Sequence, residues 1–310
     1  MSAAGIRGVL SASFTAFDSD GALDLPRTAA HAAHLLTHGC DAIAPLGTTG
    51  EANSLSGTER RRVLEALVAG GADPLRMVPG TGVCSLPETI ELTRHAYDCG
   101  VRTVLLLPPF YYPDPSEDGL FAHYSRVLDG CALPGLTVWL YHIPQMSGVP
   151  ITHGLIAGLA ASHPGTVTGV KDSSGDLDHM RGLIAAFPDL AVFAGADHLL
   201  GPLLRAGGAG CITATSNLIA PELAALAADI AAGAGEERTR VAEQRIGATR
   251  ALFQRWPQIP ALKAAHAIRT GHAGWAALRP PWLPLTNAEQ AELSRALADL
   301  TEPSLPELSA

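Results

Sequence analysis

Residues 103–128 read TVLLLPPFYYPDPSEDGLFAHYSRVL, an apolar run followed by a proline-rich loop and then by apolar residues at helical spacing. A continuous apolar strand before a helix is typical of a parallel sheet that is buried on both faces. The same alternation recurs along the chain and predicts eight strands. The expected strands are Gly8–Phe14, Asp41–Leu46, Arg76–Thr81, Thr103–Pro108, Thr137–Ile143, Val167–Lys171, Ala191–Ala194 and Gly210–Ala214.

Eight strand–helix units predict an α/β fold of the (β/α)8 TIM-barrel type rather than an open sheet. An open, doubly wound sheet usually carries a glycine-rich phosphate turn after its first strand, and residues 14–20 contain none. We expect residues 1–232 to form the barrel. Residues 233–310 are expected to form a helical extension packed on it, with a proline-rich segment at 279–284 and a last helix near 287–300.

The composition of the 310-residue chain favours a globular protein that acts on small molecules. Hydrophobic residues make up 47%, and the net charge of −9 argues against nucleic acid or an anionic membrane as a partner. No apolar run is long enough to span a membrane, and the N-terminus lacks a signal-peptide pattern. We therefore expect a cytoplasmic protein.

The cysteines and histidines predict neither a disulfide framework nor a metal site. The five cysteines form no CxxC pair, which fits a reducing compartment. Three histidines, His31, His34 and His38, share helical spacing, but no acidic residue lies within their run. We interpret them as the solvent-exposed face of an amphipathic helix.

Lysine is rare in this chain, and its placement is informative. Of 21 basic residues only Lys171 and Lys263 are lysines. Arginine cannot replace lysine where a neutral, nucleophilic amine is required. Lys171 ends an expected strand at the barrel rim, where burial favours the neutral amine and hence Schiff-base chemistry, although an ion pair with Asp172 is the alternative. Lys263 lies in an alanine-rich helix, and we interpret it as structural.

The catalytic groups of a (β/α)8 barrel lie at the carboxyl ends of its strands. The loop Gly47–Glu51 (GTTGE) follows the second strand and offers two hydroxyls and backbone N–H groups that suit a carboxylate. Tyr141 ends the strand next to that of Lys171, so it can move a proton to or from an imine. Because side chains alternate along a strand, His142 and Asp172 should point away from this pair, towards the helices.

Taken together, these segments resemble the dihydrodipicolinate synthase/N-acetylneuraminate lyase family of class I aldolases. The GTTGE loop, PPFYYP, the tyrosine-x-x-proline after the fifth strand, GVKDSSGD and GGAGCITATSN occur in the family's order and spacing, over nearly the whole chain. The resemblance implies a (β/α)8 barrel with additional C-terminal helices, a homo-oligomer (dimer or tetramer), and catalysis without a metal or organic cofactor.

The resemblance also implies a role for each matching residue. Lys171 would form the Schiff base with pyruvate or another 2-keto acid, and Tyr141 would move the proton during C–C cleavage or formation. Thr48 and Thr49 would bind the keto-acid carboxylate, and Thr48 would also share a proton relay with Tyr111 of a neighbouring subunit. The further substrate-binding positions are Gly47, Met146, Ser173, Gly195, Asp197 and Ile212, the last through its backbone.

Departures from the family pattern bear on the substrate. Dihydrodipicolinate synthases carry an arginine that holds the carboxylate of the aldehyde substrate, and Met146 stands at that position. A thioether cannot form such a clamp. The sialic acid lyases have a glutamate where this chain has His198 and a serine where it has Ala214, whereas Ser173 and Asp197 are retained. We therefore expect a 2-keto-3-deoxy sugar acid, cleaved to pyruvate and an aldehyde.

Three alternatives stay open. The same lysine imine could dehydrate a 2-keto-3-deoxy acid without releasing pyruvate, or the chain could be a 4-hydroxy-tetrahydrodipicolinate synthase. The third alternative is a non-catalytic binding or regulatory barrel. Loss of the lysine or the tyrosine would mark that class, and this chain retains both Lys171 and Tyr141.

Overall fold

The computed structural model describes residues 5–112 and 114–301, and its centre is a seven-stranded parallel sheet. The strand order is β2-β1-β7-β6-β5-β4-β3. Pro113 of the PPFYYP motif and the outer ends of the two expected domain ranges, 1–4 and 302–310, lie outside the described residues. The strands are β1 (Gly8–Ser11), β2 (Ala42–Ile43), β3 (Thr103–Leu106), β4 (Thr137–His142), β5 (Val167–Asp172), β6 (Ala191–Ala194) and β7 (Gly210–Thr213).

An eighth segment, residues 77–81, closes the sheet into a barrel between β2 and β3. On one side the backbone N–H of Val78 donates to the carbonyl of Ile43 at 2.8 Å. On the other side the N–H of Leu105 donates to the carbonyl of Pro79 at 2.9 Å. The prediction of a (β/α)8 barrel is therefore confirmed.

The third expected strand, Arg76–Thr81, is less regular than predicted. Arg76 belongs to a short 3-10 helix, η2 (Pro74–Arg76), and the residues after it form isolated bridges to β2 and β3. Pro79 lies in the middle of the segment and has no N–H to donate, so a continuous ladder cannot form there.

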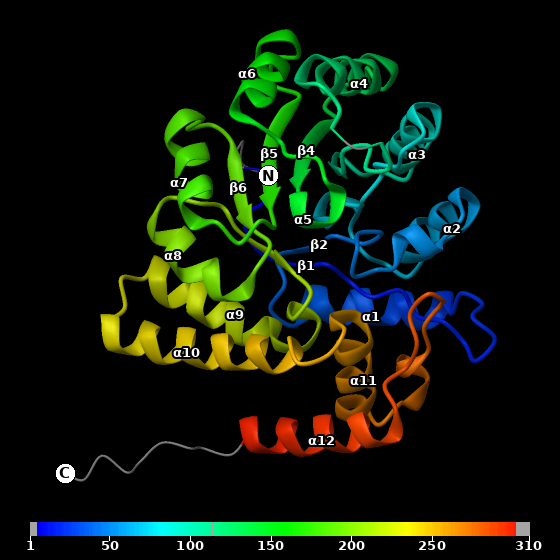
Figure 1. Ribbon diagram of the computed structural model, residues 1–310, viewed down its shortest axis with the longest axis vertical. Helices are drawn as coiled ribbons and strands as arrows, with labels where there is room; N and C mark the ends of the chain where they lie inside the picture. The colour runs from blue at the N-terminus through cyan, green and yellow to red at the C-terminus, as the bar shows by residue number, and fades with distance from the viewer. Residues whose placement is uncertain (1–4, 113, 302–310) are drawn as a thin grey trace.

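Helices surround the barrel, as Figure 1 shows. Three of them begin at serine caps: the side chains of Ser56, Ser85 and Ser116 each accept from the backbone N–H three residues on. The surrounding helices are α1 (Leu25–Thr37), α2 (Gly57–Ala69), α3 (Leu86–Asp98), α4 (Glu117–Gly130), α6 (His153–Ser162), α7 (Leu177–Ala186), α8 (Leu200–Arg205) and α9 (Ser216–Ala231). Among the described residues, none of the helices combines the length and the apolar character needed to cross a membrane.

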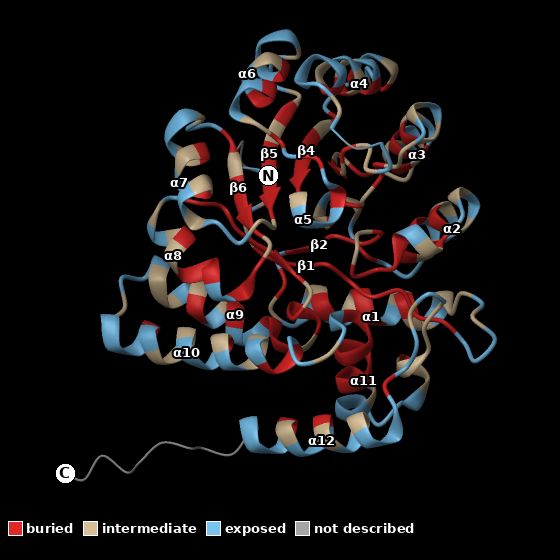
Figure 2. Ribbon diagram, in the orientation of Figure 1, coloured by how far each residue is buried: buried red, intermediate tan, exposed pale blue. Residues whose placement is uncertain are grey.

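Side chains on the strands alternate between two apolar layers, and this alternation places the site. Val138 and Leu140 of β4 pack outward against the helices, whereas Trp139 and Tyr141 pack inside the barrel. Figure 2 shows that the strands are almost wholly buried. Tyr141 therefore projects into the interior at the last inward position of its strand.

Three further helices, α10 (Glu236–Phe253), α11 (Gln258–Thr270) and α12 (Asn287–Thr301), follow the barrel. The expected domain boundary at residue 232 falls between α9 and α10. Leu262 of α11 and Leu293 of α12 share a buried cluster with Phe14, which lies just after β1. The extension thus packs beside the carboxyl end of β1, at the end of the barrel where catalytic groups are expected.

One histidine of α1 is buried, contrary to the prediction that His31, His34 and His38 form a solvent-exposed face. His34 and His38 are exposed, but the ring of His31 stacks on Phe14 with centroids 5.6 Å apart and lies 4.6 Å from that of His266. The prediction was wrong for His31 because its ring packs against His266 of α11 and against Trp275, contacts that helical periodicity alone does not reveal.

These two buried histidines predict a loss of stability in weak acid. Burial lowers the pKa of His31 to about 4 and that of His266 to about 3. Both rings are neutral in the folded protein and take up protons on unfolding, so their contribution is complete above about pH 6.5 and is lost as the pH falls towards 4. As the pH falls through that window, each of the two histidines should lower the free energy of unfolding by about 1.4 kcal/mol per pH unit.

Urea unfolding at pH 7.5 and at pH 5.0 measures this effect. We expect a His266→Phe variant, which keeps an aromatic ring in the cluster, to lose the part of the pH dependence that His266 contributes, about 1.4 kcal/mol per pH unit. The exposed His38→Ala variant is the matched control and should behave as the wild type. An unchanged pH dependence in His266→Phe would contradict the prediction.

Candidate active site

Lys171 and Tyr141 meet inside the barrel, as the sequence predicts. They are register partners on β5 and β4, and the Nζ atom of Lys171 lies 4.1 Å from the centre of the Tyr141 ring. Each residue is only 5% exposed. The alternative in which Lys171 pairs with Asp172 is not observed, because the Asp172 carboxylate is bonded to other groups on the outer side of the sheet.

The phenol of Tyr141 has the surroundings of a group that gives and takes a proton. Burial is the largest single influence and raises its pKa, but the charge of Lys171 and interactions with Thr48, Lys171 and Ser173 together outweigh it. The pKa of Tyr141 therefore lies below its ordinary value. Four of the site residues predicted from the sequence therefore lie close together: Thr48, Tyr141, Lys171 and Ser173.

The GTTGE loop is held in a fixed shape beside this pair. The N–H of Glu51 donates to the carbonyl of Thr48 at 3.0 Å, and the Thr15 hydroxyl donates to the carbonyl of Gly50 at 2.8 Å. A side chain at position 50 would come within 3.0 Å of the carbonyl oxygen of Ser13, so only glycine fits without a shift. The loop is built so that Thr48 and Thr49 keep one arrangement.

A small cavity lies between this loop and the strand ends. Gly47, Thr48 and Tyr141 line it together with a buried arginine, Arg60 of α2, which the sequence motifs do not reveal. Arg60 donates through Nε to the carbonyl of Ala52 at 3.1 Å. It lies in the run ERRR, typical of a solvated helix surface, so the sequence carries no signal for its burial.

The remaining substrate-binding predictions fall into two groups, and the first lies at the strand ends. Ile212 is buried in the barrel interior with Tyr141. Ser173 and Gly195 are in contact: a Cβ atom at position 195 would lie 2.0 Å from the Ser173 hydroxyl oxygen, so a larger residue could not be accommodated. Asp197 is buried as well, with Oδ2 at 3.5 Å from Nη1 of Arg250 and with Oδ1 lacking a hydrogen-bond partner among the described residues.

The second group is on the surface. Tyr111 is 77% exposed, and its ring packs edge-on against that of Tyr112, which is 72% exposed. Met146, on the short helix α5 (Pro144–Ser147), is 62% exposed. The single chain therefore leaves the two tyrosine side chains of the PPFYYP motif without cover.

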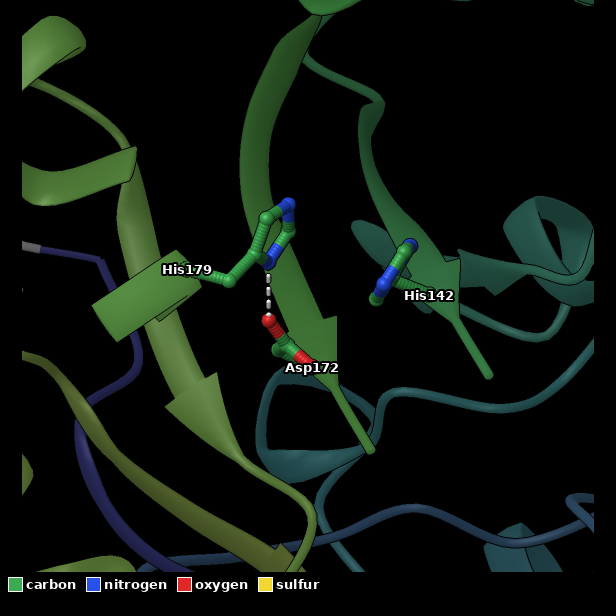
Figure 3. Close-up of side chains that lie close together, drawn as sticks. All are labelled: His142, Asp172 and His179. Carbon is green, nitrogen blue, oxygen red and sulfur yellow. Dashed lines mark hydrogen bonds and ion pairs between the residues drawn. The ribbon is translucent and has the colours of Figure 1, made fainter. Parts of the chain in front are cut away.

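His142 and Asp172 point outward, as predicted. They are register partners one residue beyond Tyr141 and Lys171, and Figure 3 shows Asp172 bonded to His179 of α7. His179 Nδ1 lies 2.6 Å from Asp172 Oδ2, and its ring stacks on that of His142 with centroids 4.7 Å apart. The cluster joins β4, β5 and α7 directly behind the two inward-facing residues.

Ligand atoms of this cluster lie within 4.8 Å of one another, which raises the question of a metal site. Each of the three residues already uses at least one of these atoms in a hydrogen bond. His142 Nδ1 accepts the N–H of Ile151 at 3.0 Å, so the proton of the neutral ring is on Nε2. Asp172 Oδ1 accepts from the N–H and the hydroxyl of Ser174 at 2.8 and 2.6 Å. We therefore interpret the cluster as a hydrogen-bonded brace.

Residues 5–300 match a family model described as the dihydrodipicolinate synthetase family. The chain belongs to this family. It is 42% identical over 292 residues to an uncharacterized DapA-like lyase of Chloroflexus aurantiacus, with 94% of this chain and 95% of the relative covered. It is 36% identical over 290 residues to a 4-hydroxy-tetrahydrodipicolinate synthase of Kineococcus radiotolerans, with 94% and 92% covered.

Solved structures of the dihydrodipicolinate synthetase family have the same fold. The dihydrodipicolinate synthase of Agrobacterium tumefaciens superposes with a TM-score of 0.86 at 32% identity, covering 96% of this chain and 100% of that one. A prophage protein of the family from E. coli K12, solved in complex with pyruvate, gives a TM-score of 0.88 at 28% identity, covering 96% and 99%. This chain is therefore a family enzyme of the class I lyase/aldolase type, as its motifs predict.

Proposed function

We propose that this enzyme cleaves a 2-keto-3-deoxy sugar acid to pyruvate and an aldehyde through a Schiff base on Lys171. The observation that carries the proposal is the buried contact between Lys171 Nζ and the Tyr141 ring at the carboxyl end of the barrel. An amine in this position can attack a keto carbon, and the tyrosine beside it can move the proton that C–C cleavage requires.

The steps follow from the placement of these groups. The Lys171 amine adds to the C2 carbonyl and, with loss of water, forms an iminium that withdraws electrons from C3. The phenolate of Tyr141 takes the proton of the C4 hydroxyl, the C3–C4 bond breaks, and its electron pair forms an enamine as the aldehyde leaves. Protonation at C3 and hydrolysis then release pyruvate and restore the amine. Thr48 and Thr49 would hold the carboxylate of the keto acid throughout.

The choice of a polyhydroxylated substrate rests on the residues expected to bind the part of the substrate that leaves as the aldehyde. Ser173 presents a hydroxyl next to Tyr141. Asp197, whose buried Oδ1 has no hydrogen-bond partner among the described residues, stands at a position where the sialic acid lyases that the sequence resembles bind the sugar. Met146, an apolar and exposed side chain, stands where a carboxylate-binding arginine would be needed for an aldehyde that carries a carboxylate. The sugar acid therefore suits this site better than the synthase substrate does.

Borohydride trapping with pyruvate, followed by peptide mass mapping, tests the mechanism. We expect a stable adduct on the peptide that contains Lys171. A panel of 2-keto-3-deoxy sugar acids then tests the reaction, with pyruvate release as the expected result. Loss of water without pyruvate would identify a dehydratase, and condensation of pyruvate with a carboxylate-bearing aldehyde would identify a synthase.

Tyr111 provides a test of whether a second subunit completes the site. If its hydroxyl belongs to a proton relay with Thr48 across a subunit contact, Tyr111→Phe should lower kcat by about 10²-fold while the borohydride adduct still forms. Tyr112→Phe, an equally exposed neighbour, is the matched control and should keep the wild-type rate. A wild-type rate in Tyr111→Phe would rule out the shared relay.

A further inference from the structure

The second lysine of the chain forms an ion pair with the GTTGE loop that is buried completely. Lys263 of α11 lies 2.5 Å from Oε1 of Glu51, and neither side chain has any exposed surface. The Lys263 ammonium also donates to the carbonyl of Ala277 at 2.9 Å and lies 4.6 Å from the centre of the Phe17 ring. Its partners thus come from three separate parts of the chain.

A buried ion pair of this kind needs an explanation other than stability. Removing two charges from water costs several kcal/mol per ion, and a well-packed apolar pair of similar volume is often at least as stable. Burial lowers the pKa of Lys263, whereas Glu51 raises it, so the charged form depends on this one carboxylate. The pair therefore fixes a specific geometry at an energetic cost.

The geometry in question is that of the loop that carries Thr48 and Thr49. Glu51 adopts a left-handed backbone conformation with a φ of 54°, which residues other than glycine rarely adopt. Its second oxygen, Oε2, accepts the backbone N–H of Arg279 at 3.3 Å. The C-terminal extension thus anchors the Glu51 carboxylate, while the backbone N–H of Glu51 closes the turn by donating to the Thr48 carbonyl.

Arg279, next to this anchor, secures the chain that follows the loop. Its guanidinium donates to the carbonyl of Ser54 at 2.9 Å and to Oε1 of Glu59 at 2.6 Å. Glu59 belongs to the capping box that begins α2. Two cations from the C-terminal extension therefore hold the segment that runs from the GTTGE loop into α2.

We propose that Lys263 and Glu51 are positioning residues, through which the C-terminal helices set the Thr48–Thr49 loop for the carboxylate of the keto acid. The inference rests on the proposed function, since it takes this loop as the carboxylate site. Neither residue touches substrate: Lys263 acts on Glu51, and Glu51 acts on the two threonines through the backbone. Loss of the pair should weaken binding of pyruvate without removing the amine that reacts with it.

The test uses two variants and the pyruvate concentration that gives half-maximal borohydride trapping. In the double variant Glu51→Gln with Lys263→Met no charge is left buried without a partner, so the fold should be retained. We expect its half-saturating pyruvate concentration to rise at least about tenfold, with full adduct yield at saturation. The Glu51→Asp variant keeps both charges but shortens the anchor by one methylene, and the same rise is expected.

The matched control is Arg205→Met with Glu243→Gln, which removes the ion pair between α8 and α10. It should leave the half-saturating concentration unchanged. A merely structural role for Lys263 would lower the melting temperature of the variants and leave pyruvate trapping at the wild-type concentration, and that result would overturn the proposal. Failure of the wild type to form any adduct would refute the proposed function instead.

Discussion

Replacing Lys171 by methionine will remove the borohydride adduct and lower kcat/KM by at least about 10⁴-fold. Methionine keeps most of the length and the apolar stem of lysine but has no amine, so no iminium can form on it. The measurement is pyruvate release from the 2-keto-3-deoxy sugar acid that the wild type cleaves, together with the mass of the peptide that contains residue 171.

The folded state should survive this substitution. Lys171 is buried against Tyr141 and makes no ion pair with the described residues, so an apolar side chain of similar volume leaves no charge without a partner. We expect the melting temperature to be unchanged or higher. A Lys171→Met variant that still formed the adduct, on any other residue, would show that the Schiff base is elsewhere.

Tyr141→Phe should separate imine formation from bond cleavage. Removing the hydroxyl deletes the group whose pKa is lowered by Lys171 and by its interactions with Thr48 and Ser173. General acid–base catalysis by one group contributes about 10²- to 10⁴-fold, and we expect kcat for cleavage to fall by that factor. The borohydride adduct with pyruvate should still form, because the Lys171 amine is intact.

Tyr124 supplies the matched control for this substitution. It is also a buried tyrosine, in α4, but its hydroxyl has no hydrogen-bond partner among the described residues, and burial raises its pKa. Tyr124→Phe should therefore keep kcat within about twofold of the wild type. Equal losses in the two variants would mean that Tyr141 contributes packing and not proton transfer.

The barrel and the identity of the residues that face its interior follow from the sequence alone. Strand periodicity of two assigns Tyr141 and Lys171 to the inside of β4 and β5 and assigns His142 and Asp172 to the outside, and the structure has all four in those places. The scarcity of lysine in the chain distinguishes Lys171 from the other polar residues at the strand ends. The predictions of which side chains point into the barrel and which point out succeed because they depend on local backbone geometry, which a short stretch of residues specifies.

The contacts between the barrel and the C-terminal extension, in contrast, become visible only in the folded chain. Lys263 and Glu51 are 212 residues apart, and neither carries a local sign that it is paired. The burial of His31 likewise depends on α11, and the closure of the barrel at residues 77–81 depends on hydrogen bonds to two other strands. Contacts of this kind are properties of the assembled fold, because long-range packing determines which polar side chains lose their water and which partners they then find.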